Sequence, residues 1–465
     1  MIRRRFVIAL ALAAIFTVAR PAVAATTVAG DLARQADLGF TTSTDDGHLR
    51  VARMTEGSAA ARAGLGVGDE IVAVNGNAFT KPYHGVAQLE RLDGNQRVSL
   101  AVVDRAGARR TIAFTPPPRP LEDVAGLDSF YDVVTTPDGA RLRTIVTRPA
   151  GAPSPVPVIF FTQWVSCDSL EFTRGGLSRE ILKVLARRSG AALIRVERAG
   201  TGDSEGPACH VLDYDTELAH YRHALDATLA RYGWLDRNRL VIYGSSLGAT
   251  MAPLVAQGRK LAGVMAQGGG ALTYLERMIT FDRQQLERTD VDPADIQERL
   301  QRQIAFNVQY LVQGRLPDDI AKDGPDMAAA RKSIRGLGDG EHYGRPYAWH
   351  QQAARHDFLQ AWSSLDAPVL VIFGEFDQFE SGHGHELIAT TVNRRHPGRA
   401  TFVEIARMDH EGDVYDTIED AYAWANPVSG PPEAAARMQT GPMLRWLRDV
   451  AGFPPPPPTD ESAVK

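Results

Sequence analysis

A serine between two glycines is the strongest chemical signal in the sequence. Gly244-Ser245-Ser246-Leu247-Gly248 follows an apolar segment at residues 240–243 and opens a helical pattern at residues 247–257. In this strand–turn–helix context, the G-x-S-x-G spacing lets the chain turn sharply and exposes the middle serine at a helix N-terminus, where the helix dipole favours a developing anion. The spacing of the glycines therefore selects Ser246, and not Ser245, as the candidate nucleophile.

A serine nucleophile needs a histidine to take its proton and an acid to orient that histidine. Asp377 follows the apolar segment at residues 369–373 and is the acid that we predict, with Glu375 as the alternative. His410 lies on the loop after the next strand pattern and is the predicted base. The three residues would combine nucleophilic attack with general acid–base chemistry.

Two further histidines, His383 and His385, form a His-Gly-His pair that could suggest a metal. A zinc site needs three or four placed ligands, and the sequence places no third one here. We therefore expect a solvated loop at these residues, and neither a metal nor another cofactor.

The candidate residues follow apolar runs that alternate with helical patterns between residues 125 and 452. The runs are residues 156–161, 192–196, 240–243 and 369–373, and the helical patterns are residues 177–188, 214–233, 247–257 and 433–449. Strands that are apolar on both faces suit a parallel sheet covered by helices, so we predict an α/β doubly wound sheet. Residues 270–362 break the alternation with charged helical patterns and are predicted to form a lid.

Residues 37–114 have a different pattern, with short alternating strands and a tight-turn signal at Asn75-Gly76. Together with a small-residue helix and loop at residues 56–69, this region resembles a bacterial PDZ domain. Leu38-Gly39-Phe40 stands where such domains carry their carboxylate-binding loop. The resemblance implies that backbone N–H groups hold a peptide C-terminus while a strand edge pairs with the peptide. The alternative is a small β domain that only packs on its neighbour.

The order of strand, nucleophile turn, acid and histidine, closed by the helix at 433–449, is identified as the pattern of an α/β-hydrolase. The turn at 198–206 resembles that of Xaa-Pro-dipeptidyl-peptidase-like and serine-aminopeptidase-like members, and the resemblance covers residues 127–450. It implies acyl transfer from an ester or a peptide. The turn itself is expected to be structural and to brace the nucleophile loop.

The same resemblance implies an oxyanion hole. It would use the N–H of Leu247 and a second N–H from the loop after the first apolar run, that of Trp164 or Val165. Relatives usually have glycine where this chain has Trp164. Because loops after neighbouring strands meet in this fold, Cys167 and Cys209 are expected to form a disulfide; two separate buried thiols are the alternative.

The first 24 residues have the pattern of a secretory signal. Arg3-Arg4-Arg5 precedes an apolar run at residues 6–19, which is short for a membrane span of about 20 residues. Ala22-Val23-Ala24 is the expected cleavage signal, an uncleaved anchor is the alternative, and the arginines fit a twin-arginine export signal loosely. We expect a periplasmic or secreted protein with no membrane span after cleavage.

The composition excludes several classes of protein. The 465 residues carry a net charge of −5, and 44% of them are hydrophobic, an ordinary globular balance. The sequence has no basic stripe of the kind that a nucleic-acid binder needs. Pro-rich segments at residues 115–124 and 453–465 are expected to be a stiff linker and a disordered tail.

These patterns together predict an exported serine hydrolase that acts on an ester or a peptide, with a PDZ-like domain that binds a peptide or a partner. An acyltransferase could use the same triad with another nucleophile in place of water. A binding protein with an inactive hydrolase body is a further alternative, against which the intact Ser, Asp and His argue.

Overall fold

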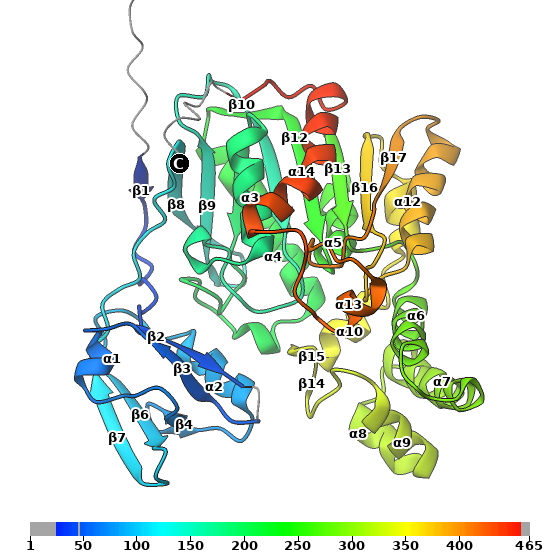
Figure 1. Ribbon diagram of the computed structural model, residues 1–465. Coiled ribbons are helices and arrows are strands. Elements are labelled where there is room, and N and C mark those ends of the chain that lie inside the picture. The colour runs from blue at the N-terminus through cyan, green and yellow to red at the C-terminus, as the bar shows by residue number, and fades with distance from the viewer. Residues whose placement is uncertain (1–24, 45–46, 457–465) are drawn as a thin grey trace, which may run out of the picture.

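The structure is a computed structural model that describes residues 25–44 and 47–456 (Figure 1). A small β-rich domain lies below a larger domain built on a central sheet (Figure 1). The predicted signal at residues 1–24 and most of the predicted tail lie outside the described residues. The tail prediction needs one correction, because Phe453 is buried and its N–H donates to Leu447 O at 2.9 Å.

The small domain is an antiparallel sheet with two helices. Its elements are β2 (Phe40–Ser43), β3 (Arg50–Met54), α1 (Ala59–Arg62), β4 (Glu70–Val74), β5 (Asn77–Ala78), α2 (Pro82–Leu89), β6 (Val98–Val103) and β7 (Arg109–Phe114). The strand order is β2-β3-β4-β6-β7, with β5 paired to β4, so β2 is an edge strand. Every second residue of β6 is buried because only one face of the sheet covers a core.

The large domain contains a nine-stranded sheet. Its strands are β1 (Thr26–Val28), β8 (Leu127–Thr135), β9 (Arg141–Pro149), β10 (Val156–Thr162), β11 (Ala192–Val196), β12 (Leu235–Ser245), β13 (Gly263–Gln267), β16 (Val369–Gly374) and β17 (Ala400–Ile405). The spatial order is β1-β8-β9-β11-β10-β12-β13-β16-β17, and β9 runs antiparallel to its two neighbours. Without β1, this is the strand order of the α/β-hydrolase fold, and it confirms the predicted fold class.

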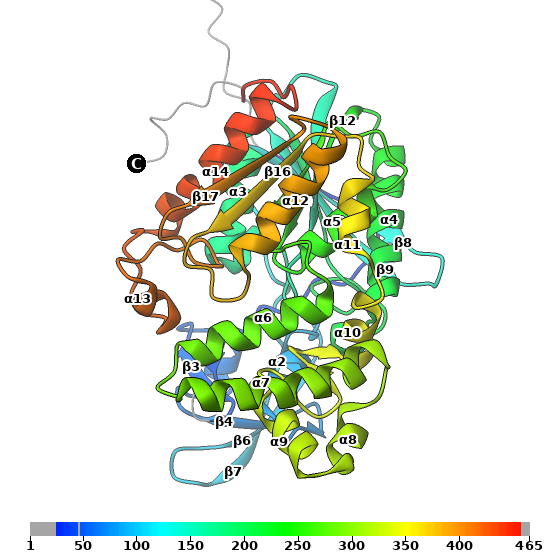
Figure 2. The same ribbon diagram turned by 90° about the vertical axis from the view of Figure 1, so that its right-hand side faces the viewer.

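Helices cover both faces of this sheet, as its apolar strands require. α3 (Leu177–Arg188) and α14 (Pro432–Asp449) pack on one face, and α4 (Tyr214–Arg231), α5 (Gly248–Ala256) and α12 (Gly382–Arg395) pack on the other (Figure 2). The short segments η1 (Phe172–Arg174), η2 (Cys209–Val211) and α13 (Ile418–Tyr422) lie in loops between them. The loops at the carboxyl ends of the strands therefore share one edge.

The predicted lid is an insertion between β13 and β16. It contains α6 (Tyr274–Glu287), α7 (Pro293–Asn307), η3 (Val308–Val312), α8 (Pro317–Ile320), η4 (Ala321–Asp323), α9 (Pro325–Ser333), the hairpin β14 (Glu341–His342) and β15 (Arg345–Pro346), α10 (Tyr347–Ala353) and α11 (Phe358–Ser363). Its last two helices pack on α4, α5 and α12 through the fully buried Trp349 and Trp362. This final part thus belongs to the main core rather than to a lid.

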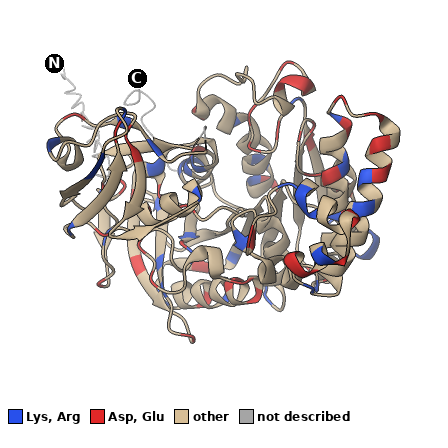
Figure 3. Ribbon diagram, turned by 90° about the horizontal axis from the view of Figure 1, so that it is seen from below, with Lys and Arg blue, Asp and Glu red and all other residues tan. Residues whose placement is uncertain are grey.

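Charged residues of both signs are interspersed over both domains (Figure 3). On α7, for example, Arg302 pairs with Glu298 at 2.5 Å, one helical turn away. Such exposed pairs stabilise helices only slightly. Among the described residues, no helix combines the length and the apolarity that crossing a membrane requires.

The Pro-rich segment at residues 115–124, predicted to be a stiff linker, is held on the large domain at its end. Glu122 is buried, and its carboxylate pairs with the equally buried Arg195 of β11. The Phe172 N–H also donates to this carboxylate, at 3.0 Å. A buried charge needs such partners, and here they fix the end of the segment to the large domain.

Further ion pairs join the two domains. Arg34, between β1 and β2, pairs with Glu171 at 2.7 Å and with Asp203. Arg174 of η1 pairs with Glu90, just after α2, at 2.6 Å. The small domain is therefore fastened to the loops after β10 and β11.

Candidate active site

Ser246 occupies the sharp turn between β12 and α5. Its φ of +54° is a strained value for a residue with a side chain, and strain of this kind is expected at an exposed nucleophile. Gly244 and Gly248 permit the turn, because a Cβ at either position would collide with backbone. At Gly248 the colliding atom is the carbonyl oxygen of Thr162, so this glycine brings the turn against the loop after β10.

The three predicted catalytic side chains lie in one chain of hydrogen bonds. Ser246 Oγ is 2.8 Å from His410 Nε2, and His410 Nδ1 is 2.9 Å from Asp377 Oδ2. The Asp377 carboxylate also accepts the N–H groups of Phe379 and Glu380, at 2.8 and 2.9 Å. The loops after β12, β16 and β17 thus bring together the predicted nucleophile, base and acid.

The charges of this chain are set by burial and by mutual contact. Burial alone would lower the pKa of His410, but the adjacent Asp377 carboxylate outweighs it and the pKa is raised above its usual value. Burial alone would raise the pKa of Asp377, but the contact with His410 outweighs it and the pKa is lowered. Asp377 is therefore ionised at neutral pH, as an orienting acid must be.

The two alternatives considered from the sequence lie outside this chain. Ser245 Oγ donates to Gln267 Oε1 at 2.7 Å rather than facing the histidine. Glu375 is exposed and accepts the N–H of Arg407 at 2.8 Å. Gln267 was missed from the sequence. Its amide donates to His410 O at 3.0 Å, and only its place at the carboxyl end of β13 could have signalled it.

The predicted oxyanion donors face the same space. Trp164, Val165, Leu247 and Ser246 all line one cavity. Within the described chain, the N–H groups of Trp164, Val165 and Leu247 donate to no protein acceptor. Unpaired N–H groups beside a nucleophile are what an oxyanion hole requires.

The cavity has a volume of about 390 Å³, and its wall combines polar and apolar side chains in similar measure. Its apolar lining includes Phe161, Trp164, Leu177, Ile181, Phe281 and Phe379. Two arginines also reach it, but each already has a carboxylate partner: Arg179 pairs with Asp168, and Arg277 pairs with Glu380.

The two remaining site predictions in the large domain have different outcomes. Cys167 and Cys209 form a disulfide, with 5.7 Å between their Cα atoms, which confirms that prediction. The expectation of a solvated loop at His383 and His385 is wrong, because both lie in the first turn of α12. His383 is exposed, whereas His385 is buried and its Nδ1 lies 2.8 Å from Ser381 O. No cluster of three or more metal-ligating side chains is present in the described parts of the chain.

The predicted carboxylate-binding loop of the small domain precedes the edge strand β2. Gly39 has a φ of +70° and lies against Ser58, so no larger residue fits there. Its N–H donates to Asp37 Oδ1 at 3.2 Å. Of Leu38, Gly39 and Phe40, the central residue thus already has an anionic partner, which a peptide carboxylate would have to displace.

Residues 50–104 match the sequence profile of the family described as PDZ domain. No curated protein matches the chain. Among solved structures, the chain is similar to an esterase of Pyrococcus furiosus (13% identity, covering 72% of this chain and 95% of that one, TM-score 0.42). It is also similar to an acylaminoacyl peptidase of Pyrococcus horikoshii (13% identity, 80% and 51% covered, TM-score 0.43). The small domain is thus a PDZ domain, and strand order and site geometry define the large one as an α/β-hydrolase fold.

Proposed function

We propose that this protein is a serine hydrolase that cleaves an ester or a peptide bond through an acyl-enzyme. The observation that carries the proposal is the hydrogen-bond chain from Ser246 through His410 to Asp377. It ends in a cavity beside three N–H groups that have no acceptor among the described residues. A fold alone would not suffice, because α/β folds host many functions.

The geometry assigns a role to each group. Ser246 Oγ attacks the carbonyl carbon while His410 Nε2 takes its proton, and Asp377 holds the imidazole in place and stabilises its positive charge. The oxyanion receives hydrogen bonds from the N–H of Leu247 and from the loop of Trp164 and Val165. The imidazolium then protonates the leaving group, and water repeats the sequence to release the acid.

The substrate class follows from the cavity wall. Apolar and aromatic side chains form about half of the wall, two acids, Asp168 and Glu411, also line it, and the arginines that reach the cavity are already paired. The acyl group should therefore be apolar rather than anionic. The PDZ domain supports a peptide as the larger ligand, because an extended chain could add to the edge strand β2.

The proposed compartment is the periplasm or the outside of the cell. The disulfide supports it, because such bonds persist in oxidising compartments. Thiol counting on protein recovered from the exported fraction should give none free before reduction and two after. Two free thiols in that fraction would argue against export.

The decisive test is Ser246→Ala, with Ser245→Ala as the matched control. A fluorophosphonate probe should label the wild type and Ser245→Ala but not Ser246→Ala. Hydrolysis of p-nitrophenyl esters and aminoacyl anilides should fall at least about a thousandfold in Ser246→Ala, since triad members act as a unit. A Ser246→Ala protein that keeps activity, or a wild type that neither reacts with the probe nor hydrolyses any of the panel, would contradict the proposal.

A further inference from the structure

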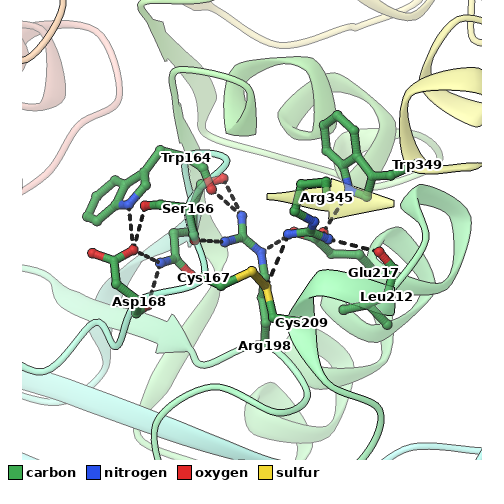
Figure 4. Close-up of a disulfide and its surroundings, with 11 residues drawn as sticks. Trp164, Ser166, Cys167, Asp168, Arg198, Cys209, Leu212, Glu217, Arg345 and Trp349 are labelled. Carbon is green, nitrogen blue, oxygen red and sulfur yellow. Dashed lines mark hydrogen bonds and ion pairs between the residues drawn. A yellow bond between two sulfur atoms is a disulfide. The ribbon is translucent and has the colours of Figure 1, made fainter. Parts of the chain in front are cut away.

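The loop that carries Trp164 and Val165 is held from the inside by one arginine (Figure 4). Arg198 Nη1 donates to Ser166 O at 2.6 Å, and Nη2 donates to Gln163 O at 3.0 Å and to Trp164 O. Three carbonyls within four residues thus point at one buried guanidinium. This corrects the expectation from the sequence, because the turn after β11 braces the loop after β10 and not the nucleophile loop.

Because of the geometry of the peptide unit, these contacts of the carbonyl groups also fix the direction of the neighbouring N–H groups. Each peptide unit is planar and trans, so its C=O and N–H point in opposite directions. The carbonyl of Gln163 shares a unit with the N–H of Trp164, and the carbonyl of Trp164 shares one with the N–H of Val165. With both carbonyls turned toward Arg198, both N–H groups are turned away from it, and they donate to no acceptor in the described chain.

We infer that Arg198 is a positioning residue that aims the oxyanion donors of the loop at the cavity. This inference rests on the proposed hydrolase function. Relatives usually have a glycine in this loop, and its conformational freedom helps the loop to adopt its shape. This chain has Trp164 at that position, so contacts with other parts of the chain must hold the loop in shape. Arg198 supplies them through three acceptors, which a planar fork of donors can reach and a single ammonium group cannot.

The guanidinium is itself fixed by a buried acid. Arg198 Nε donates to Glu217 Oε1, and the other oxygen of Glu217 accepts from Arg345 and, at 3.1 Å, from Trp349 Nε1. Burial would raise the pKa of Glu217, but the two guanidinium groups outweigh it and lower the pKa to about 2. Because Arg345 belongs to β15, the brace also connects the loop to the insertion (Figure 4).

The loop has further attachments that do not depend on Arg198. Cys167, one residue beyond the last braced carbonyl, is bonded to Cys209. The indole N–H of Trp164 donates to Asp168 Oδ1 at 2.9 Å, and Asp168 pairs with Arg179. Changing Arg198 should therefore alter the aim of the peptide units more than the general path of the loop.

The test is Arg198→Lys, which keeps a positive charge beside Glu217 but cannot reach all three carbonyls. The matched control is Arg195→Lys. Arg195 is equally buried and paired with Glu122, and it binds the carbonyl of Leu170 but no carbonyl of residues 162–168. The readout compares kcat/KM for an apolar p-nitrophenyl ester with that for its thionoester, whose sulfur is a poor hydrogen-bond acceptor.

This ratio measures the oxyanion hole and does not depend on how much of a variant is folded. We expect the preference of the wild type for the oxygen ester to fall at least tenfold in Arg198→Lys, with kcat for that ester falling about a hundredfold and KM changing less than about threefold. The ratio should be unchanged in Arg195→Lys. If Arg198→Lys yields no folded protein, Glu217→Gln, which loosens the brace, should lower the ratio about twofold to fivefold.

An unchanged ratio in Arg198→Lys, or in Glu217→Gln where that variant is needed, would overturn the inference. So would an equal fall in Arg195→Lys, because the effect would then follow from the loss of any buried arginine. A wild type without esterase activity would instead refute the proposed function. The two failures are therefore distinguishable.

Discussion

One wall of the cavity comes from the loop after β10 and the start of α3, and a second wall comes from α6 and Tyr343 of the insertion. On the first wall a disulfide, Arg198 and the pair of Arg179 with Asp168 bind the chain at several points. On the second, Arg277 pairs with Glu380, but Asp282 Oδ2 and the Tyr343 hydroxyl are buried without a partner among the described residues, against one such atom, Gln163 Oε1, on the first wall. Buried polar groups without partners are costly, so the two walls differ in local stability.

The difference extends into the interior of the insertion. Further buried polar atoms without a partner in the described chain are found on Gln303, Asn307, Tyr310 and His342. Large apolar side chains such as Phe306 and Leu300 still give this part a core. The comparison predicts that the insertion is the less stable of the two walls.

The largest expected effect concerns Asp377, which follows β16 and belongs to neither wall. Asp377→Asn should lower kcat by about ten-thousandfold, because an amide cannot hold the imidazole in the tautomer that accepts the serine proton. Glu375→Gln is the control and should change kcat by less than about threefold. An equal loss of kcat in steady-state assays of the two variants would mean that Asp377 is not the orienting acid.

The stability of the first wall depends on its cross-link. The disulfide joins residues 42 positions apart, and a loop of that size corresponds to about 4 kcal/mol of unfolding free energy in the chain-entropy description. The double variant Cys167→Ala and Cys209→Ala should lose about this much in urea unfolding. A loss below about 1 kcal/mol would show that the other contacts hold the wall without it.

Asp282, the buried acid of the second wall, should make the free energy of unfolding depend on pH. Burial raises the pKa of Asp282 to about 7, whereas the same carboxyl in the unfolded chain has a pKa of about 4. Because the folded state then binds the extra proton, the free energy of unfolding should fall by up to about 4 kcal/mol as the pH rises from about 4 to about 7.

Asp282→Asn keeps the shape of the side chain without its charge. It should remove that part of the pH dependence and stabilise the protein above pH 7, as measured by urea unfolding across the pH range. Asp290→Asn, at an exposed acid of the same insertion, is the control. If the two variants follow the same pH curve, Asp282 is not held as a neutral acid.

The grouping of three hydrogen-bonded side chains could be predicted from the sequence because the signal for each of them is local. Ser246, Asp377 and His410 each follow a strand pattern, and each is a residue type that the chemistry needs. Apolar runs likewise predicted the parallel sheet, because a strand buried on both faces must be apolar along its whole length.

The contacts that hold the walls could not be predicted in the same way. The partners of Arg198 lie 19 residues away at Glu217 and 32 residues away at Ser166. An arginine carries no periodic signal that identifies the carbonyl it will meet. For the same reason the burial of Glu122 could not be predicted. It lies in a Pro-rich segment, whose composition indicates stiffness but not burial.

The smallest expected effect concerns the PDZ domain, whose binding loop belongs to neither wall. A peptide with a free C-terminal carboxylate should bind at Leu38-Gly39-Phe40 about tenfold more tightly than its C-terminally amidated form. Asp37→Asn should increase this preference, since it removes an anion that now occupies the Gly39 N–H. Titration calorimetry with both peptides checks this; equal affinities would mean that the loop does not read the carboxylate.

The short strand β1 changes how the PDZ domain is connected. β1 pairs in parallel with β8, so the chain contributes a strand to the main sheet before it forms the PDZ domain and returns to the neighbouring strand after it. A domain on one flexible tether samples a volume set by the length of that tether. A domain anchored at both ends cannot swing in this way. A peptide bound along β2 would therefore approach the large domain from one fixed direction.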